Sequence, residues 1–218
     1  MRLIPSFLMV IAACALTAPA CASLIVNGSF EDGPEVPDRP GYLLRPDADT
    51  SITGWVVKAP VAGRDIEIIT TYWQPADGLR SLDLNGRNGP GGIAQTFATN
   101  PGHQYDVSFM MAGNPSGEKL TTLKVLAAGQ AREFTFDASE SSRVNMGWVS
   151  RLWSFTATES STELWFHMVF PDSGSQGCAL DMVEVLDRGL VPEPAAATLF
   201  SLGLTLVAVG CWRRRRIG

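Results

Sequence analysis

The chain has few of the residues from which enzyme sites are usually built. Its 218 residues include only 2 histidines, and it has no Cys-x-x-Cys pair, no Gly-x-Ser-x-Gly elbow and no phosphate-binding loop. His103 follows a Pro-Gly turn and His167 lies in a strand pattern, so neither has a metal-binding or serine partner nearby in sequence. Among enzymes, a glycoside hydrolase with paired carboxylates remains an alternative, because the spacing of two acids in space is not visible in a sequence.

Basic residues are scarce between the two ends of the chain. Of 17 lysines and arginines, Arg2 and Arg213–Arg216 belong to the ends, which leaves 12 between residues 23 and 190. That segment keeps 21 of the 22 acidic residues, because only Glu193 lies outside it, and its net charge is therefore −9. This sign disfavours nucleic acid as a partner, since such binding depends on phosphate neutralisation by lysine and arginine. Neutral glycans and divalent cations remain candidate ligands.

Both ends indicate export. Residues 1–22 have a positive start at Arg2, an apolar stretch from Phe7 to Leu16 and small residues around Cys21, which is typical of a signal peptide. A lipoprotein acylated at Cys21 is the alternative, although the residues before it lack the usual aliphatic side chain. Residues 195–212 are uncharged and mostly apolar, long enough to cross a bilayer, and the arginines that follow predict a cytoplasmic end.

The last 28 residues combine three elements in a fixed order: a short motif, the apolar segment 195–212 and the cluster Arg213, Arg214, Arg215 and Arg216. The motif is Val191, Pro192, Glu193 and Pro194. This arrangement resembles the PEP-CTERM sorting signal of Gram-negative bacteria. The resemblance implies processing by an exosortase, transient anchoring in the inner membrane, and a final place at the cell surface or outside the cell. The prolines favour an extended, protease-accessible segment just outside the membrane.

Residues 23–190 form a segment of the right size for one domain. Cys178 is its only cysteine, so no disulfide can form within it, and a core of this size can stabilise an exported domain without one. We expect Cys178 to be a small buried side chain rather than a nucleophile.

Apolar residues alternate with polar ones throughout this segment. About ten short strands and no amphipathic helix predict an all-β, antiparallel β-sandwich. Clear alternation occurs in residues 105–111 and 164–168, and further strands are expected at 52–57, 66–70, 81–84 and 93–98. The proline-rich and acidic residues 31–49 predict an irregular loop, and residues 187–194 a link to the membrane.

Several motifs spread along the domain resemble the choice-of-anchor C family. They are residues 24–33, 52–55, 76–86, 92–97, 101–105 and 178–185. The resemblance implies a galactose-binding-like jelly roll, similar to carbohydrate-binding modules. Met182 departs from the asparagine that is commoner after Asp181.

Asp181 lies on the same strand face as Val183 and Val185, which predicts a buried carboxylate. Such a group needs a cation or several donors. The family resemblance implies a structural calcium held by Glu31, Asp181 and nearby backbone carbonyls, which would tie the first strand to the last. The alternative is that Glu31 caps a turn and Asp181 pairs with an arginine such as Arg151.

Six tryptophans favour sugar binding, because an aromatic face stacks on a pyranose. Trp55, Trp153 and Trp165 lie in strand patterns and are expected in the core. We expect the ligand platform at Trp73 with Tyr72, beside a loop, or at Trp148.

The sequence therefore predicts an exported, non-catalytic domain that binds extracellular polysaccharide or organises a biofilm matrix. The alternatives are an enzyme acting on polysaccharide and a surface protein that associates with itself.

Overall fold

A computed structural model describes residues 22–169 and 177–190, and within these ranges all regular structure is β-strand. The strands are β1 (Tyr42–Pro46), β2 (Val56–Val57), β3 (Asp65–Ile69), β4 (Ser81–Asp83), β5 (Asn85–Gly86), β6 (Gly89–Pro90), β7 (Gly92–Ala98), β8 (His103–Gly113), β9 (Leu120–Ala127), β10 (Gln130–Asp137), β11 (Val149–Thr156), β12 (Ser161–Met168) and β13 (Cys178–Leu190).

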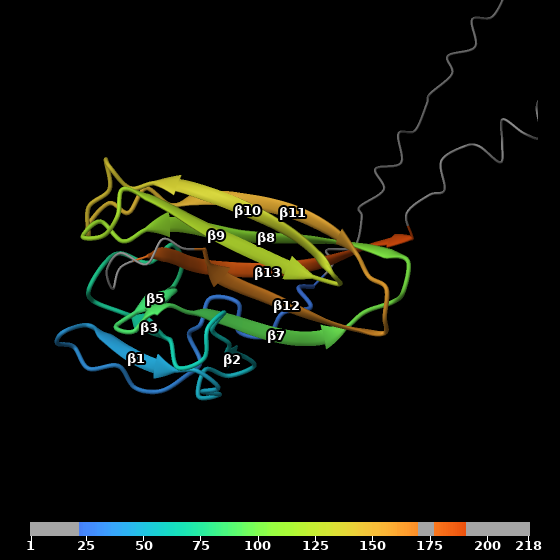
Figure 1. Cartoon of the computed structure of the whole chain (residues 1–218), viewed down its shortest axis with the longest axis horizontal. Helices are drawn as coiled ribbons and strands as arrows, with labels where there is room; N and C mark the ends of the chain where they lie inside the picture. The colour runs from blue at the N-terminus through green and yellow to red at the C-terminus, as the bar shows by residue number, and fades with distance from the viewer. Residues whose placement is uncertain (1–21, 170–176, 191–218) are drawn as a thin grey trace, which may run out of the picture.

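The strands form two antiparallel sheets packed face to face (Figure 1). One sheet has six strands in the order β1-β3-β4-β13-β8-β11, and the other has five in the order β10-β9-β12-β7-β2. β5 and β6 form a separate short hairpin. The prediction of an all-β, antiparallel β-sandwich is confirmed.

Alternating burial explains why these segments form strands. In β12 the side chains of Leu164, Phe166 and Met168 point into the sandwich, whereas Glu163 and Trp165 point out of it. Successive residues of a strand face opposite sides, so one row contributes to the core and the other forms the outer surface of the sheet. The same alternation occurs in β8 and β9, which supply inward-facing residues from both sheets.

Three segments differ from the sequence prediction. Residues 42–46, which were expected in a loop, form edge strand β1, paired with β3 from Tyr42 to Pro46. Only Val56 and Val57 of the expected strand 52–57 form a strand. The last strand continues past residue 187 to Leu190, because β13 remains paired with β8 there. Tertiary pairing, which the local composition does not reveal, decides each of these cases.

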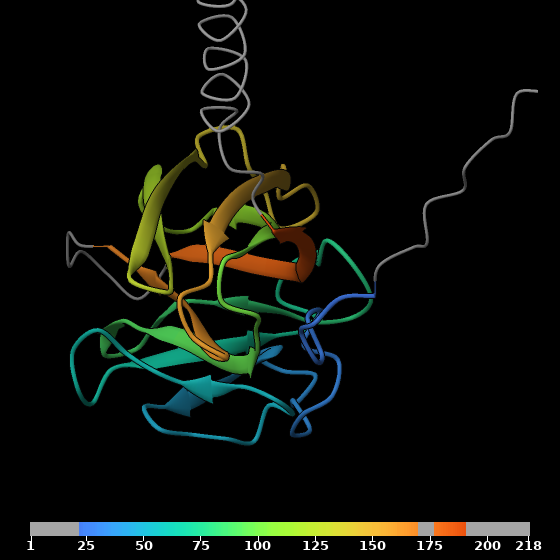
Figure 2. The same ribbon diagram turned by 90° about the vertical axis from the view of Figure 1, so that its right-hand side faces the viewer.

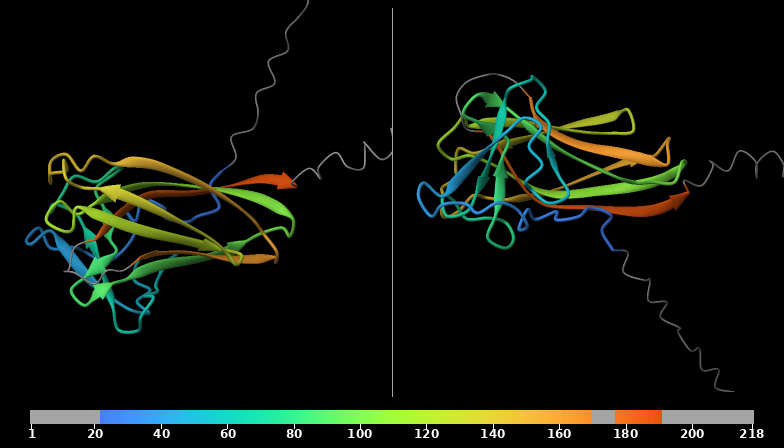
Figure 3. Two further views of the ribbon diagram at one scale, coloured as in Figure 1. Left: turned by 45° about the horizontal axis from the view of Figure 1, so that its top comes forward. Right: turned by 90° about the horizontal axis from the view of Figure 1, so that it is seen from below.

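The first described residues run beside β13 (Figure 3). Leu24 N–H donates to Val185 O at 2.9 Å, and Val183 N–H donates to Gly28 O at 2.9 Å. A Cβ on Gly28 would lie 2.0 Å from Val183 O, so only glycine permits this approach. The opening motif Asn27-Gly28 therefore fastens the beginning of the domain to its last strand.

At the right-hand end of Figure 1, which faces the viewer in Figure 2, the β7–β8 and β11–β12 turns meet the end of β13. Leu190 pairs with His103 there, and Gly102 N–H donates to Ala157 O at 2.8 Å. The chain therefore leaves the described domain from a strand that is paired to its final residue.

The expected signal peptide, sorting motif, apolar segment 195–212 and arginine cluster lie almost entirely outside the described residues. Within residues 22–169 and 177–190, no helix is long and apolar enough to cross a membrane.

Candidate functional site

Trp73, the first expected ligand platform, is a core residue. Its side chain is 3% exposed, and its indole N–H donates to Ser81 Oγ at 2.8 Å. A sugar cannot stack on a ring whose faces are covered by protein, so the prediction of an exposed platform at Trp73 is wrong. The residue lies between strands, where no alternation marks the buried side.

Tyr72 and Trp148 are half-buried at the same end of the sandwich. Arg143 covers the Tyr72 ring, with the guanidinium carbon 3.9 Å from the ring centre, and also donates to the Tyr72 hydroxyl at 2.6 Å. Trp148 donates its indole N–H to Gln74 O at 3.0 Å, and this hydrogen bond fixes the orientation of the ring. Among these three expected residues, the structure therefore leaves Tyr72 and Trp148 partly accessible but covers one face of Tyr72.

Trp165 is a half-buried, outward-facing aromatic that the sequence prediction missed. Trp55 and Trp153 are buried as expected, but Trp165 is only partly buried and points away from the core. Its position in the sequence did contain the information, because Leu164, Phe166 and Met168 occupy the inward positions of that strand. The expectation that Trp165 is a core residue is therefore wrong.

The Trp165 ring is held in one orientation. Its indole N–H donates to Lys58 O at 2.8 Å, and the His167 ring lies beside it with ring centres 4.4 Å apart. The Lys58 ammonium lies 4.9 Å from the Trp165 ring centre and pairs with Glu163 at 2.5 Å. A fixed indole surrounded by hydrogen-bonding groups is the arrangement that sugar sites use.

Trp165 lines one hollow on the outer surface of the five-stranded sheet, and a second hollow lies next to the first. The first has a volume of about 390 Å³ and is lined by Trp165, Leu126 and residues of the β9–β10 and β11–β12 turns. The second, of about 330 Å³, is lined by Val56, Ala94, Gln95 and Thr96, among others. Lys58 and Glu163 line both hollows, which are therefore neighbours.

The two carboxylates expected to bind calcium do approach the same loop, but as acceptors of backbone hydrogen bonds. Asp181 Oδ2 accepts from the N–H groups of Ala76 and Asp77 at 2.9 and 3.1 Å. Glu31 Oε1 accepts from those of Leu79 and Arg80 at 2.8 and 2.9 Å. The turn-capping alternative for Glu31 is thus confirmed.

These contacts fit a calcium site at the pair poorly. Asp181 Oδ1 accepts a further hydrogen bond, from Met182 N–H at 2.7 Å. No three His, Cys, Asp or Glu side chains in the described parts of the chain are placed to hold a metal ion, so the remaining calcium ligands would have to be backbone carbonyls. Arg151 is not the partner of Asp181, because its guanidinium donates to Thr135 O at 2.6 Å.

A second acidic group lies where β3 pairs with β4. Glu67 is opposite Asp83, which is fully buried and accepts from Asn85 N–H, Gly177 N–H and the Asn114 side-chain amide. Burial raises the pKa of Asp83 to about 7, against the lowering effect of these donors. Burial and then the neighbouring charge of Asp83 raise the pKa of Glu67 to about 8. Asp83 is inaccessible to a substrate, so this pair does not form a hydrolase site.

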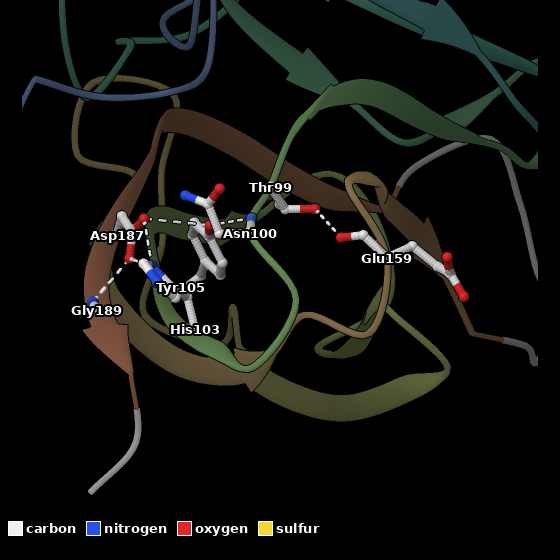
Figure 4. A network of polar contacts seen from close by, with 7 residues as sticks. All are labelled: Thr99, Asn100, His103, Tyr105, Glu159, Asp187 and Gly189. Atoms are coloured by element: carbon white, nitrogen blue, oxygen red, sulfur yellow. Dashed lines mark hydrogen bonds and ion pairs between the residues drawn. The ribbon is translucent and has the colours of Figure 1, made fainter.

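His103 acquires a carboxylate partner that is distant in sequence (Figure 4). Its Nδ1 lies 2.9 Å from Asp187 Oδ2, and the same carboxylate accepts from Tyr105 OH at 3.2 Å and from Gly189 N–H at 2.7 Å. The Tyr105 oxygen in turn accepts from Asn100 N–H at 2.8 Å. The network fastens the end of β13 to β8 and to the β7–β8 turn.

Cys178 is fully buried in β13, and burial raises the pKa of its thiol to about 12. A thiol with this pKa is protonated at neutral pH, so it is a packing residue rather than a nucleophile.

The sequence of this domain matches one family model over residues 23–186, described as a protein of unknown function, DUF642. The chain belongs to this family. Halomucin of Haloquadratum walsbyi is 28% identical over 179 residues, which are 81% of this chain but 2% of that protein. The chain therefore corresponds to a small part of Halomucin.

Two solved structures are similar to most of this chain at low sequence identity. TmCBM61 in complex with β-1,4-galactotriose is 13% identical, with a TM-score of 0.46, covering 76% of this chain and 99% of that one. A family 16 carbohydrate-binding module is 16% identical, with a TM-score of 0.46, covering 75% of this chain and 99% of that one. These similarities concern the fold alone.

Proposed function

We propose that this DUF642 domain is a non-catalytic polysaccharide-binding domain whose site is centred on Trp165. The observation that carries the proposal is a fixed, outward-facing indole that lines one of two neighbouring hollows, with Lys58, Glu163 and His167 around it. An indole stacks on the apolar face of a pyranose while the surrounding polar groups bind its hydroxyls.

Trp148 offers a matched control for Trp165. Both indoles are half-buried, and both donate N–H to a backbone carbonyl. In a pull-down on insoluble polysaccharides and a glycan array, Trp165→Ala is expected to weaken binding about thirtyfold, as for a binding hot spot of about 2 kcal/mol. Trp148→Ala should bind as the unaltered chain does. The reverse result would move the site to the loop end, near Tyr72.

We also propose that the domain is exported through residues 1–22 and sorted through residues 191–218. In this proposal an exosortase recognises residues 191–194 while the apolar segment lies in the inner membrane, and the domain ends at the cell surface or in a biofilm matrix. Replacing Glu193 with alanine should leave full-length protein in the membrane fraction on an immunoblot. Unchanged release would reject the sorting role of this motif.

The enzymatic alternative has one specific observation in its favour. Glu159 and Glu163 both line the hollow beside Trp165, and two carboxylates are the usual machinery of glycoside hydrolysis. If the glycan that binds is also cleaved, and Glu163→Gln abolishes cleavage while binding persists, the domain is a hydrolase. If the bound glycan is recovered intact, binding is the function.

A further inference from the structure

A continuous apolar row crosses the outer surface of the five-stranded sheet at Trp165. Residues directly opposite one another in antiparallel strands share a face, and the register places one residue from each strand in this row. From β2 to β10 the row is Val56, Ala94, Trp165, Leu126 and Ala131. We call these five residues the apolar stripe.

The stripe joins the two hollows into one path. Leu126 and Trp165 line the first hollow, while Val56 and Ala94 line the second. Ala94 is 3% exposed and forms the floor of the second hollow, whereas Val56 is 42% exposed at one end of the stripe. Four strand separations of about 4.8 Å give a stripe about 19 Å long, which is longer than a disaccharide.

Polar rows border the stripe on both sides. Thr96 and Glu163 are opposite each other on one side, and His167, Lys124 and Glu133 follow one another on the other side. Each row lies two residues along the strands, about 7 Å from the stripe. A sugar chain has the matching pattern, because its rings present apolar faces and carry hydroxyl groups at their edges.

The charges beside the stripe compensate one another. Lys58 pairs with Glu163 at 2.5 Å, and Lys124 with Glu133 at 3.6 Å. Glu159, which also lines the first hollow, adds a negative charge that disfavours an anionic sugar. A protein partner fits less well, since a stable interface buries on the order of 1,000 Å² or more, and the stripe is one residue wide.

The Lys58 side chain crosses the stripe. Lys58 N–H donates to Gly92 O, and Gly92 lies opposite His167 on one side of the stripe. The Lys58 ammonium lies over Trp165 and reaches Glu163 on the other side. The side chains of Lys58 and Glu163 are 42% and 45% exposed. Opening an ion pair this exposed costs little, at most about 1 kcal/mol. A ligand can therefore displace it and still gain from the indole beneath.

We infer that the stripe binds an internal stretch of a neutral, linear polysaccharide, which runs across the strands from β2 to β10 over Trp165. The inference rests on the proposed glycan binding and adds the ligand class, the direction of the chain and the minimum length. A stripe that is open at both ends does not read chain ends, and it is filled only by a ligand of about four sugar units or more, given its length of about 19 Å.

The test uses the full chain in mild detergent and calorimetric titration with oligosaccharides of two to about six units from β-1,4-linked glucan, xylan, mannan and galactan. For the oligosaccharide series that binds, affinity should rise at least about tenfold from the disaccharide to the longest oligomer, because further sugar rings cover apolar surface. Chemical reduction of the chain end should leave the affinity of the longest oligomer unchanged.

Two substitutions shorten the stripe from its ends. Val56→Arg and Ala131→Arg should each lower the affinity for the longest oligomer about tenfold, because each removes one apolar residue that a sugar ring would cover. The affinity for the disaccharide should not change. Leu152→Arg is the control, since Leu152 is 59% exposed on β11 of the other sheet.

The possible failures differ from one another. If no oligosaccharide and no parent polysaccharide binds the unaltered chain, the proposed function itself is rejected. If a glycan binds through Trp165 but the dimer binds as tightly as the longest oligomer, or reduction of the chain end abolishes binding, only the stripe is rejected. A dimer of this chain that Val56→Arg dissociates would assign the stripe to a second copy instead.

Discussion

The two aromatic clusters of this domain have similar compositions and opposite environments. At the loop end, Trp73 is buried against Ser81 while Arg143 covers Tyr72. On the sheet, Trp165 faces outward while Lys58 lies over it. The Arg143 guanidinium is 3.9 Å from the Tyr72 ring centre and also donates to the Tyr72 hydroxyl. The Lys58 ammonium is 4.9 Å from the Trp165 ring centre and pairs with the exposed Glu163. Arg143, although exposed, is therefore held by both the ring and the hydroxyl of Tyr72, whereas the Lys58 ammonium lies over Trp165 without a hydrogen bond to it.

This difference predicts that the two tryptophans contribute to different properties. Trp73→Ala should lower the free energy of unfolding by about 3–5 kcal/mol, because it leaves a large cavity in the core. Trp165→Ala should lower it by less than about 1 kcal/mol, since the ring lies on the surface. Urea denaturation of both variants measures the contrast. Equal losses would mean that Trp165 is a structural residue, and the proposed site would then lose its main support.

Part of this contrast could be predicted from the sequence, and part could not. The alternation around Leu164, Phe166 and Met168 predicts the strand and, applied strictly, places Trp165 on the outer surface. No periodicity surrounds Trp73, so its burial depends on contacts with β4 that only the folded chain brings together. The stripe likewise depends on the register of five strands, and register between segments distant in sequence is not visible in local composition.

The pH dependence of stability should separate the two regions further. Glu67 and Asp83 lie on β3 and β4, beside Ser81, the partner of Trp73. Their folded pKa values are raised to about 8 and about 7, so the folded state binds more protons than the unfolded state above about pH 4. The stabilising contribution of these groups is complete below about pH 4 and is lost as the pH rises to about 8, with a slope of at most about 1.4 kcal/mol per pH unit for each group.

Urea midpoints between pH 5 and pH 8 measure this loss. Glu67→Gln should reduce the slope, whereas Glu133→Gln, on the outer surface of β10, should leave it unchanged. Glycan binding should not follow the same profile. Burial lowers the pKa of His167 below its usual value, so the ring beside Trp165 takes up a proton less readily than a free histidine does. A stability that is constant from pH 5 to pH 8 would contradict the assignment of raised pKa values to the β3–β4 pair.

The smallest expected effect is that of calcium on thermal stability. It concerns the loop of residues 76–80, which follows Tyr72 and Trp73 and contacts β13 through Asp181. Glu31 and Asp181 hold residues 76–80 of this loop through four backbone N–H groups. If these hydrogen bonds alone fix the loop, EDTA should leave the thermal midpoint unchanged. Glu31→Gln should then cost about 1 kcal/mol with or without calcium, because the amide oxygen still accepts from Leu79 and Arg80 but has lost its charge. If adding calcium instead raises the thermal midpoint by several degrees, and Glu31→Gln abolishes this rise, the calcium prediction holds. The ion would then take the place of backbone N–H groups as the partner of these carboxylates.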